Sequence, residues 1–406
     1  MNLCELLQAT DGVLLQGDAR TEVRSLCYDS RAVTPGALFV CLPGLHTDGH
    51  DFARQAAAAG AAVIVCERPV AGLPEDLPVV QVTHGRRALA QLAIRFYGEP
   101  AKRLTMIGIT GTKGKTTTAH LIAAVLTAAG RRVGLIGTNG VCWPGFRQAL
   151  DHTTPESSDL QRLLRQMADA GCDACVMEVS SLGLKMDRVT GIRYDIGIFT
   201  NLSPDHIGPG EHASFAEYRA WKSVLFRRCR VGIVNGDDPQ TEAILTQHTC
   251  RVVTYGIDRP ADWRAAPDFA LLRQPGMLGV AFTATGPDGI PRAFQVAMPG
   301  RFSVCNALAA IAAADVLHLP GTAVQTGLRT AVVEGRVEPV PLDAPFTVVL
   351  DYAHNEAAAE NLLTALRAYQ PARLIVVFGC GGGRSRVRRF GMGEACARLA
   401  DFCIVT

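Results

Sequence analysis

The sequence has no long apolar run and almost no excess of one charge. No stretch reaches the roughly 18 consecutive apolar residues that a membrane-spanning helix needs. The 40 Lys and Arg nearly balance the 38 Asp and Glu, which leaves a formal net charge of +2. Its overall charge therefore gives no attraction to nucleic acid or to an anionic membrane, and we expect neither as a partner. An anionic ligand would have to be held by a local site.

The sequence also lacks a cysteine framework, and its first residues do not show the pattern of a leader. Its 13 cysteines show no spacing typical of disulfide-rich domains. The pair Cys172-x-x-Cys175 has no second Cys or His pair at zinc spacing, and we interpret both residues as part of the core. The first residues, MNLCELLQATDGVLL, contain neither a basic segment nor a long apolar one. Together these features predict a cytoplasmic protein.

Apolar runs divide the chain into three expected domains of α/β class. Residues 1–97 contain short apolar runs between Gly and Pro turns, which predicts a small α/β domain. In residues 98–332, apolar strands alternate with helical stretches such as 116–129 and 159–170, a pattern typical of a parallel sheet covered by helices. Residues 333–406 repeat this alternation, but the last apolar run ends the sequence, so we expect an incomplete third domain.

The stretch MIGITGTKGKTTTAHLI joins an apolar strand to a helical pattern. Glycines in such a loop let backbone N–H groups turn toward one point, and the helix N-terminus adds positive potential. The spacing is G-x-x-G-K-T instead of the common G-x-x-x-x-G-K-[ST], yet the Lys can still reach phosphates and the Thr hydroxyl can bind Mg²⁺. We predict a site for a nucleoside triphosphate, formed by Gly111, Thr112, Lys113, Gly114, Lys115, Thr116 and Thr117.

Polar residues near the ends of later strands add to this predicted site. Glu178 follows an apolar strand and could complete Mg²⁺ coordination with Thr116. His206 follows another apolar strand, and Lys222 lies in the helical stretch after it. Taken singly, these three could also be a surface carboxylate, a turn histidine and a solvated helix lysine.

Taken together, the motifs resemble the Mur ligase family over almost the whole chain. In order they are GITGTKGKTTT, MEVSSLGLKMDRV, FTNLSPDH, YRAWKSVLF, NGDDP, GRFSVCNALAA, GRVEPV, DYAHN and VFGCGGGR. The N-terminal stretch DSRAVTPGALFVCLPGLHTDGH resembles the uridine-nucleotide domain of the branch that adds the third amino acid of the peptidoglycan stem peptide. The resemblance implies that 1–97 binds the uridine nucleotide, 98–332 binds ATP, and 333–406 binds the amino acid.

The resemblance implies a reaction through an acyl phosphate. The γ-phosphoryl group of ATP passes to the D-glutamyl carboxylate of UDP-N-acetylmuramoyl-L-alanyl-D-glutamate, and the amine of the amino acid then displaces phosphate. Two anions must meet, so cations are needed: Lys115 on the phosphates, one Mg²⁺ at Thr116 and Glu178, and a second at His206 and Lys222. In the family, the lysine at the position of Lys222 is carbamylated by CO₂, which turns a cation into an anionic ligand.

The resemblance also assigns binding residues one at a time. The uridine diphosphate contacts are Ser30, Leu45, His46 and Thr47, and the muramoyl dipeptide contacts are Thr153, Thr154, Ser180 and Arg188. The remaining contacts are Asn306 for adenine, Arg336 for a phosphate, Asp351 for ribose, and Arg384 for the carboxylate of the incoming amino acid. One departure is Met186, which stands where family members often carry a Gln and cannot make the same hydrogen bonds.

Several alternatives stay open at this point. Family members continue past the position of Thr406 into a D-N-P-R-type motif that selects the amino acid, so the sequence leaves meso-diaminopimelate and L-lysine open. A folylpolyglutamate synthetase-like ligase would share the loop and the acyl phosphate, although the N-terminal stretch argues against it. A nucleotide- or UDP-sugar-binding protein without catalysis is the other alternative. The arginines at 384, 386, 388 and 389 could form a nucleic-acid patch or a solvated face, but the near-neutral charge makes the patch a weak case. We expect a monomer.

Overall fold

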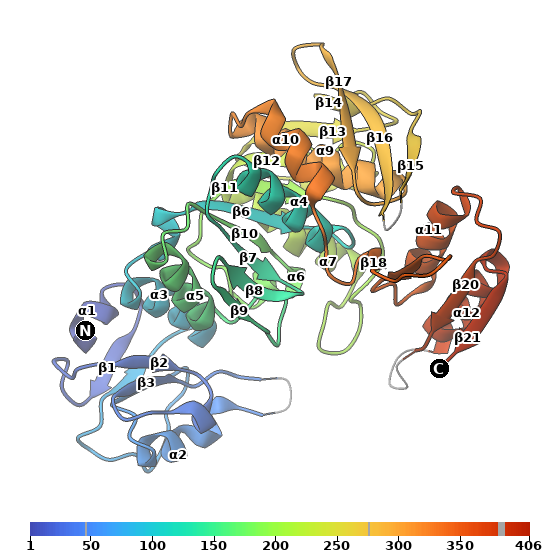
Figure 1. Ribbon diagram of the computed structural model, residues 1–406. Helices are drawn as coiled ribbons and strands as arrows, with labels where there is room; N and C mark the ends of the chain where they lie inside the picture. Colours follow the sequence, from blue (N-terminus) through green and yellow to red (C-terminus); the bar gives the residue numbers. More distant parts are fainter. Residues whose placement is uncertain (45–46, 275–276, 381–385) are drawn as a thin grey trace.

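The computed structural model describes residues 1–44, 47–274, 277–380 and 386–406. Its N-terminal, central and C-terminal parts follow one another across Figure 1, from blue through green and yellow to red. None of the helices in these described ranges is long and apolar enough to cross a bilayer. Cys172 and Cys175 are both buried in the core, as predicted.

The N-terminal part is a five-stranded sheet of order β1-β5-β4-β3-β2. Strands β2 to β5 pair in parallel, and β1 joins β5 antiparallel. The central strands β3 and β4 are buried on both faces, which explains their continuous apolar sequences. The elements are α1 Leu3–Leu7, β1 Val13–Gln16, β2 Ser25–Cys27, η1 Ser30–Ala32, β3 Ala37–Val40, η2 Gly49–Phe52, α2 Ala53–Ala58, β4 Val63–Cys66, β5 Val79–Gln81 and α3 Gly85–Phe96.

The central part is built on a parallel run of strands in the order β14-β13-β12-β11-β6-β10-β7. Helices α4 and α9 pack into the hydrophobic core on one side of the sheet, and α5 and η4 pack into the core on the other. The predicted helices 116–129 and 159–170 are α4 and α5. The elements are η3 Pro100–Arg103, β6 Thr105–Thr110, α4 Lys115–Ala128, β7 Val133–Gly137, α5 Ser157–Asp169, β10 Ala174–Glu178, α6 Ser181–Lys185, β11 Tyr194–Phe199, α7 Phe215–Ser223, η4 Val224–Arg227, β12 Cys229–Asn235, α8 Thr241–Ile244, β13 Arg251–Gly256, α9 Arg301–Val316 and α10 Gly321–Thr330.

The sheet is mixed, because antiparallel strands extend both ends of the parallel run. At one end β7 continues into β8 (Gly140–Trp143) and β9 (Phe146–Gln148). At the other end β16 pairs antiparallel with β14, β15 and β17. These further elements are β14 Trp263–Ala265, β15 Ala270–Gln274, β16 Met277–Thr285 and β17 Pro291–Val296. The predicted parallel sheet is therefore the interior of a larger one.

The C-terminal part contains two separate strand pairs. β18 and β19 pair antiparallel, and β20 and β21 pair in parallel. Helices α11 and α12 bury one apolar layer between them. On β20 and β21, Ile375, Val377 and Phe402 remain 49%, 63% and 49% exposed. The elements are β18 Glu338–Val340, β19 Val348–Leu350, α11 Glu356–Arg367, β20 Ile375–Phe378, α12 Arg386–Leu399 and β21 Phe402–Val405.

The contact between α10 and α4 gives a test of how tightly the central part is packed. A Cβ on Gly327 would lie 2.5 Å from the backbone Cα of Val125, so the two helices could approach this closely only with glycine there. We expect Gly327→Ala to lower the free energy of unfolding by about 1–3 kcal/mol, because the helix backbones must separate. Urea unfolding followed by circular dichroism measures the change.

Gly321→Ala is the matched control for this substitution. Gly321 begins the same helix, and a Cβ there would meet nothing within 4 Å. It should change the unfolding free energy by no more than about 0.5 kcal/mol. Equal effects of the two substitutions would show that the α10–α4 contact is not the constraint we describe.

Candidate functional site

The site begins at the turn between β6 and α4. Strand β6 ends at Thr110 and α4 starts at Lys115, so four residues make the turn. Gly111 and Gly114 have φ of +149° and +83°, in a region that favours glycine. A Cβ on Gly111 would overlap the hydroxyl of Thr200, and one on Gly114 would lie 2.6 Å from Asn306 Oδ1. The predicted glycines are therefore required by backbone geometry and by close neighbours.

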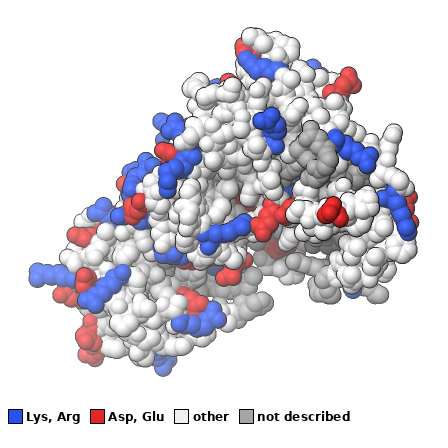
Figure 2. All heavy atoms as spheres, in the orientation of Figure 1, with Lys and Arg blue, Asp and Glu red and all other residues white. Residues whose placement is uncertain are grey.

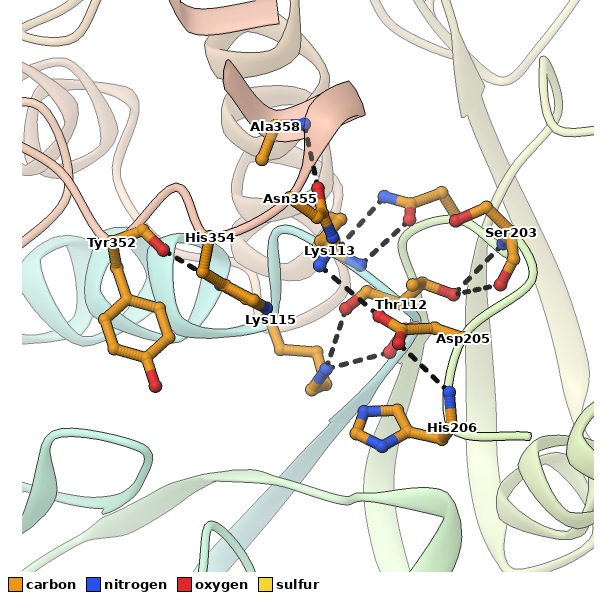
Figure 3. A network of polar contacts seen from close by, with 12 residues as sticks. Thr112, Lys113, Lys115, Ser203, Asp205, His206, Tyr352, His354, Asn355 and Ala358 are labelled. Carbon is orange, nitrogen blue, oxygen red and sulfur yellow. Dashed lines mark hydrogen bonds and ion pairs between the residues drawn. The ribbon is translucent and has the colours of Figure 1, made fainter. Parts of the chain in front are cut away.

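Side chains from the end of β11 and from α7 hold the carbonyls of this turn. The carbonyl of Lys113 accepts hydrogen bonds from Thr200 Oγ1 at 2.6 Å and from Asn201 Nδ2 at 3.0 Å. The Gly111 carbonyl accepts from the Nζ atoms of both Lys115 and Lys222, each at 2.9 Å. Figure 3 shows part of this network around Thr112, Lys113 and Lys115. The N–H groups of Thr112 and Lys113 donate to Asn201, so the turn can present to an anion the N–H groups from Gly114 onward.

Glu178 lies directly beside the start of α4. Its carboxylate accepts from Thr116 Oγ1 at 2.9 Å and from the backbone N–H of Thr138 at 2.8 Å. The residue is 1% exposed, so the alternative of a surface carboxylate is wrong. A carboxylate beside a hydroxyl offers the hard oxygen ligands that Mg²⁺ prefers. This pair fits the predicted metal.

Lys222 is buried and is not a solvated helix lysine. It is 1% exposed, and its Nζ lies 4.5 Å from the ring centroid of Tyr218. Burial lowers the pKa of Lys222 well below that of an exposed lysine, and the positive charge of Lys115 lowers it further. Burial also lowers the pKa of Lys115. Two lysines thus share one carbonyl in a desolvated site, which favours the neutral amine at Lys222.

His206 sits on an exposed loop after β11. Its φ is +54°, its side chain is 49% exposed, and Nδ1 lies 2.8 Å from Glu211 Oε1. The neighbouring Asp205 pairs with Lys113 Nζ at 3.4 Å. Within the described ranges, no group of three or more His, Cys, Asp and Glu side chains could hold a metal ion as it stands. The assignment of His206 and Lys222 to a second metal stays a prediction.

Most of the predicted residues line one cleft of about 900 Å³. Both the central part and the C-terminal part contribute to its wall. The predicted residues in the wall are Thr112, Lys113, Gly114, Lys115, Thr116, Thr117, Thr153, Thr154, Glu178, Ser180, Arg188, His206, Asn306, Arg336 and Asp351. On the face drawn in Figure 2, Lys and Arg are interspersed with Asp and Glu, so no basic patch on that face competes with the cleft for anions.

Other predicted residues lie elsewhere. Lys222 donates to the carbonyl of Gly111 in the turn, and neither residue is among the described residues of the wall. Ser30 and Thr47 belong to the N-terminal part and likewise do not line the cleft as described. The predictions for Leu45, His46 and Arg384 fall outside the described residues.

At the C-terminal side of the cleft, two predicted residues are held in place. The carboxylate of Asp351 accepts from the backbone N–H groups of Val337 at 2.9 Å and Ala353 at 2.7 Å, while desolvation raises its pKa. Arg336 lies over the ring of Tyr352, with 4.7 Å between its Cζ and the ring centroid. These contacts restrict the positions of both side chains in the wall of the cleft.

At the opposite end, Thr154 and Arg188 form the predicted dipeptide wall. Thr154 Oγ1 donates to the Glu178 carbonyl and accepts from the N–H of Ser180, each at 3.0 Å. Arg188 donates through Nη1 to the carbonyl of Thr154 at 3.0 Å. Met186 Sδ lies 3.9 Å from Arg188 Nη2. The thioether is a weak acceptor, whereas the side-chain oxygen of a Gln would accept a strong hydrogen bond.

The sequence analysis missed several residues in or beside this site, among them Thr138, His354 and Glu156. Thr138, at the end of β7, binds Glu178 through both its N–H and its hydroxyl. His354 lines the cleft from the DYAHN motif. Glu156 binds Arg188 from the loop before α5. The ends of predicted parallel strands could have pointed to Thr138, but nothing in the sequence pairs Glu156 with Arg188.

Comparison with protein families matches three segments of the chain. Residues 22–97 match the Mur ligase family catalytic domain, 109–314 the Mur ligase middle domain, and 335–406 the Mur ligase glutamate ligase domain. Two similar proteins are UDP-N-acetylmuramoyl-L-alanyl-D-glutamate–2,6-diaminopimelate ligases. The one from Geobacillus thermodenitrificans is 40% identical over 100% of this chain and 83% of its own length. The one from Alkaliphilus metalliredigens is 38% identical over 100% of this chain and 81% of its own length.

Solved structures agree with this comparison. A UDP-N-acetylmuramoyl-L-alanyl-D-glutamate–2,6-diaminopimelate ligase superposes with a TM-score of 0.78 at 26% identity, covering 100% of this chain and 82% of its own. A MurF ligase from Thermotoga maritima in complex with ADP has a TM-score of 0.67 at 19% identity, with coverage of 94% and 84%. A folylpolyglutamate synthase from Mycobacterium tuberculosis shares the fold, with a TM-score of 0.63 at 22% identity. The superposition covers 77% of this chain and 77% of the synthase.

The contact between Glu178 and Thr116 gives a test of the metal site. Glu178→Gln keeps the size and one acceptor oxygen but removes the negative charge. We expect a non-hydrolysable ATP analogue to lose about tenfold in affinity with Mg²⁺ present, because the cation loses an anionic ligand. Without Mg²⁺ the affinity should be equal or higher, since a charge that repels the phosphates is gone. Titration calorimetry with and without the metal measures both.

Glu99→Gln is the control, because Glu99 is half exposed and its one ion pair among the described residues is with Lys102 at the surface. It should retain the full gain in affinity that Mg²⁺ gives the wild type. If Glu178→Gln retained that gain as well, Glu178 would not be a metal ligand.

Proposed function

This chain belongs to the Mur ligase family, and we propose that it is an ATP-dependent ligase that acts on UDP-N-acetylmuramoyl-L-alanyl-D-glutamate in peptidoglycan synthesis. One observation carries the proposal: a single cleft is lined by the phosphate-binding turn, by Glu178 and by Arg188. Such a cleft can bring a triphosphate and a carboxylate substrate together. We further propose the domain limits 1–97, 98–332 and 333–406, a cytoplasmic location and a monomeric state.

For the added amino acid, we propose 2,6-diaminopimelate over L-lysine. Eight relatives at 37–40% identity are named as diaminopimelate ligases, and the alignments cover at least 96% of this chain. The folylpolyglutamate alternative is less favoured, because residues 22–97 match a Mur ligase domain.

The residues of the cleft suit transfer through an acyl phosphate. An oxygen of the D-glutamyl carboxylate attacks the γ-phosphorus of ATP, and the bond to ADP breaks. The amine then attacks the acyl carbon, loses a proton and expels phosphate. Lys115 and the N–H groups of the turn would offset the charge of the phosphates, and Arg188 would bind the dipeptide. Mg²⁺, held by Thr116 and Glu178, would add charge neutralisation between the two anions.

We also propose that Lys222 is carbamylated. The neutral amine attacks CO₂, a proton leaves to water, and an N-carboxylate remains. The lowered pKa of Lys222 supports this, because only the neutral amine reacts. The anion formed would lie near Lys115 and would offset the positive charge of that lysine.

The first test is phosphate release by the 406-residue chain with ATP, Mg²⁺ and UDP-N-acetylmuramoyl-L-alanyl-D-glutamate. We expect sustained release only when diaminopimelate is added, with lysine and no amino acid as comparisons. Lys115→Ala should abolish the release, because the phosphates lose their buried cation. Release with a folate and glutamate, but not with the UDP-dipeptide, would contradict the proposal, as would tight dipeptide binding without turnover.

Carbamylation of Lys222 can be observed directly with ¹³C-labelled bicarbonate. We expect a carbamate carbon signal in the NMR spectrum of the wild type and its absence in Lys222→Arg. The signal should grow as the pH rises through the lowered pKa of Lys222, because deprotonation supplies the reactive amine. The exposed Lys102, as Lys102→Arg, is the control and should leave the signal unchanged. A Lys222→Ala variant with full activity would rule out a catalytic role for the carbamate.

A further inference from the structure

A nearly buried carboxylate lies between two arginines at the junction of the N-terminal and central parts. Glu156 Oε1 accepts from Arg188 Nε at 2.9 Å, and the Glu156 carboxylate accepts from Arg86 Nη1 at 3.0 and 3.1 Å. The side chains of Glu156 and Arg188 are 9% and 10% exposed, and that of Arg86 is 24% exposed. The cluster is therefore well shielded from water.

The three residues come from three separate elements. Arg86 stands in the first turn of α3, in the N-terminal part, and Glu156 directly precedes α5. Arg188 follows α6 and lines the cleft, whereas Arg86 and Glu156 are not among the described residues of its wall. Among the described hydrogen bonds, Arg86 is linked to Arg188 through their shared partner Glu156.

The hydrogen bonds of Arg188 fix the plane of its guanidinium. Nε and Nη2 both lie 2.9 Å from Glu156 Oε1, and Nη1 donates to the carbonyl of Thr154 at 3.0 Å. A planar guanidinium with contacts on two sides has little freedom to turn. Glu156 therefore determines which edge of Arg188 faces the cleft.

The charges of the cluster explain why a second arginine is needed. A lone Glu156–Arg188 pair would be neutral and would attract an anion weakly. With Arg86 on the same carboxylate, two positive charges face one negative charge. The cluster keeps a net positive charge in a shielded place, where its attraction for a carboxylate is strong.

We propose that Arg86 and Glu156 are positioning residues for Arg188 that make the binding of the dipeptide carboxylate depend on docking of α3. This inference rests on the proposed function for the identity of the anion. It assigns to the N-terminal part a role in the acceptor end of the cleft, in addition to its proposed contact with the uridine nucleotide.

The test compares binding of UDP-N-acetylmuramoyl-L-alanyl-D-glutamate and of a non-hydrolysable ATP analogue by calorimetry. We expect Arg86→Ala to weaken dipeptide binding about tenfold and to change the affinity for the ATP analogue less than about twofold. Arg86→Lys, which keeps the charge, should recover part of the loss. In steady-state assays the change should appear in the KM for the dipeptide and not in that for ATP.

A double-mutant cycle separates positioning from simple packing. When Glu156→Gln is already present, Arg86→Ala should cost the dipeptide much less affinity, because Arg86 acts through that carboxylate. Arg165→Ala is the matched control: Arg165 lies on α5 and donates to the carbonyl of Tyr97, which follows α3, at 3.4 Å. It loosens the same junction far from Arg188 along α5, and should leave dipeptide affinity within about twofold.

The outcomes distinguish the two proposals. If the wild type binds the dipeptide and the folded Arg86→Ala and Arg86→Lys variants bind it equally well, this inference alone is overturned. An Arg165→Ala variant that loses as much affinity as Arg86→Ala would overturn it too, since docking alone would then explain the effect. Wild type that neither binds the dipeptide nor releases phosphate with it would overturn the proposed function, and this inference with it.

Discussion

The site depends on one constraint, which is that the carbonyl groups of the turn after β6 must be satisfied on the protein side. A turn that presents N–H groups to phosphates directs its carbonyls inward, where unpaired they would destabilise the fold. Thr200 and Asn201 at the end of β11, together with Lys222 of α7, supply the donors. Neighbouring parallel strands end at the same edge of the sheet, so β11 is placed to do this.

This arrangement concentrates positive charge in a desolvated place. Lys115 and Lys222 meet at one carbonyl, and the nearby negative charges are Glu178 and Asp205. These groups leave little negative charge to hold metal ions beside the lysines. A triphosphate, and the negative charge that the proposed carbamate would give Lys222, would both add to it.

Sequence patterns predicted the parts of the molecule whose signals are local. The strand–turn–helix at 105–128 follows from apolar periodicity and glycine spacing, and α5 from its amphipathic pattern. The antiparallel strands β8, β9 and β15 to β17 were missed, and so was β14, which pairs in parallel with β13. Strands β8, β9 and β14 are only three or four residues long, which leaves little periodicity to detect. Burial of Lys222 and the Arg86–Glu156–Arg188 cluster depends on packing between distant segments, which no local pattern records. The family resemblance selected the residues, but only the structure showed their partners.

The nucleotide and acceptor ends of the cleft are joined through the last residue of β10. The Glu178 side chain binds Thr116 of α4, while its backbone carbonyl accepts from Thr154 Oγ1. The carbonyl of Thr154 in turn accepts from Arg188. Each link is a buried hydrogen bond of 2.9–3.0 Å, and β10 is clamped between β6 and β7. A shift of β10 would therefore displace the expected metal ligand and the acceptor arginine together. With β10 paired on both sides, the proposed triphosphate and dipeptide carboxylate would be held at a fixed separation.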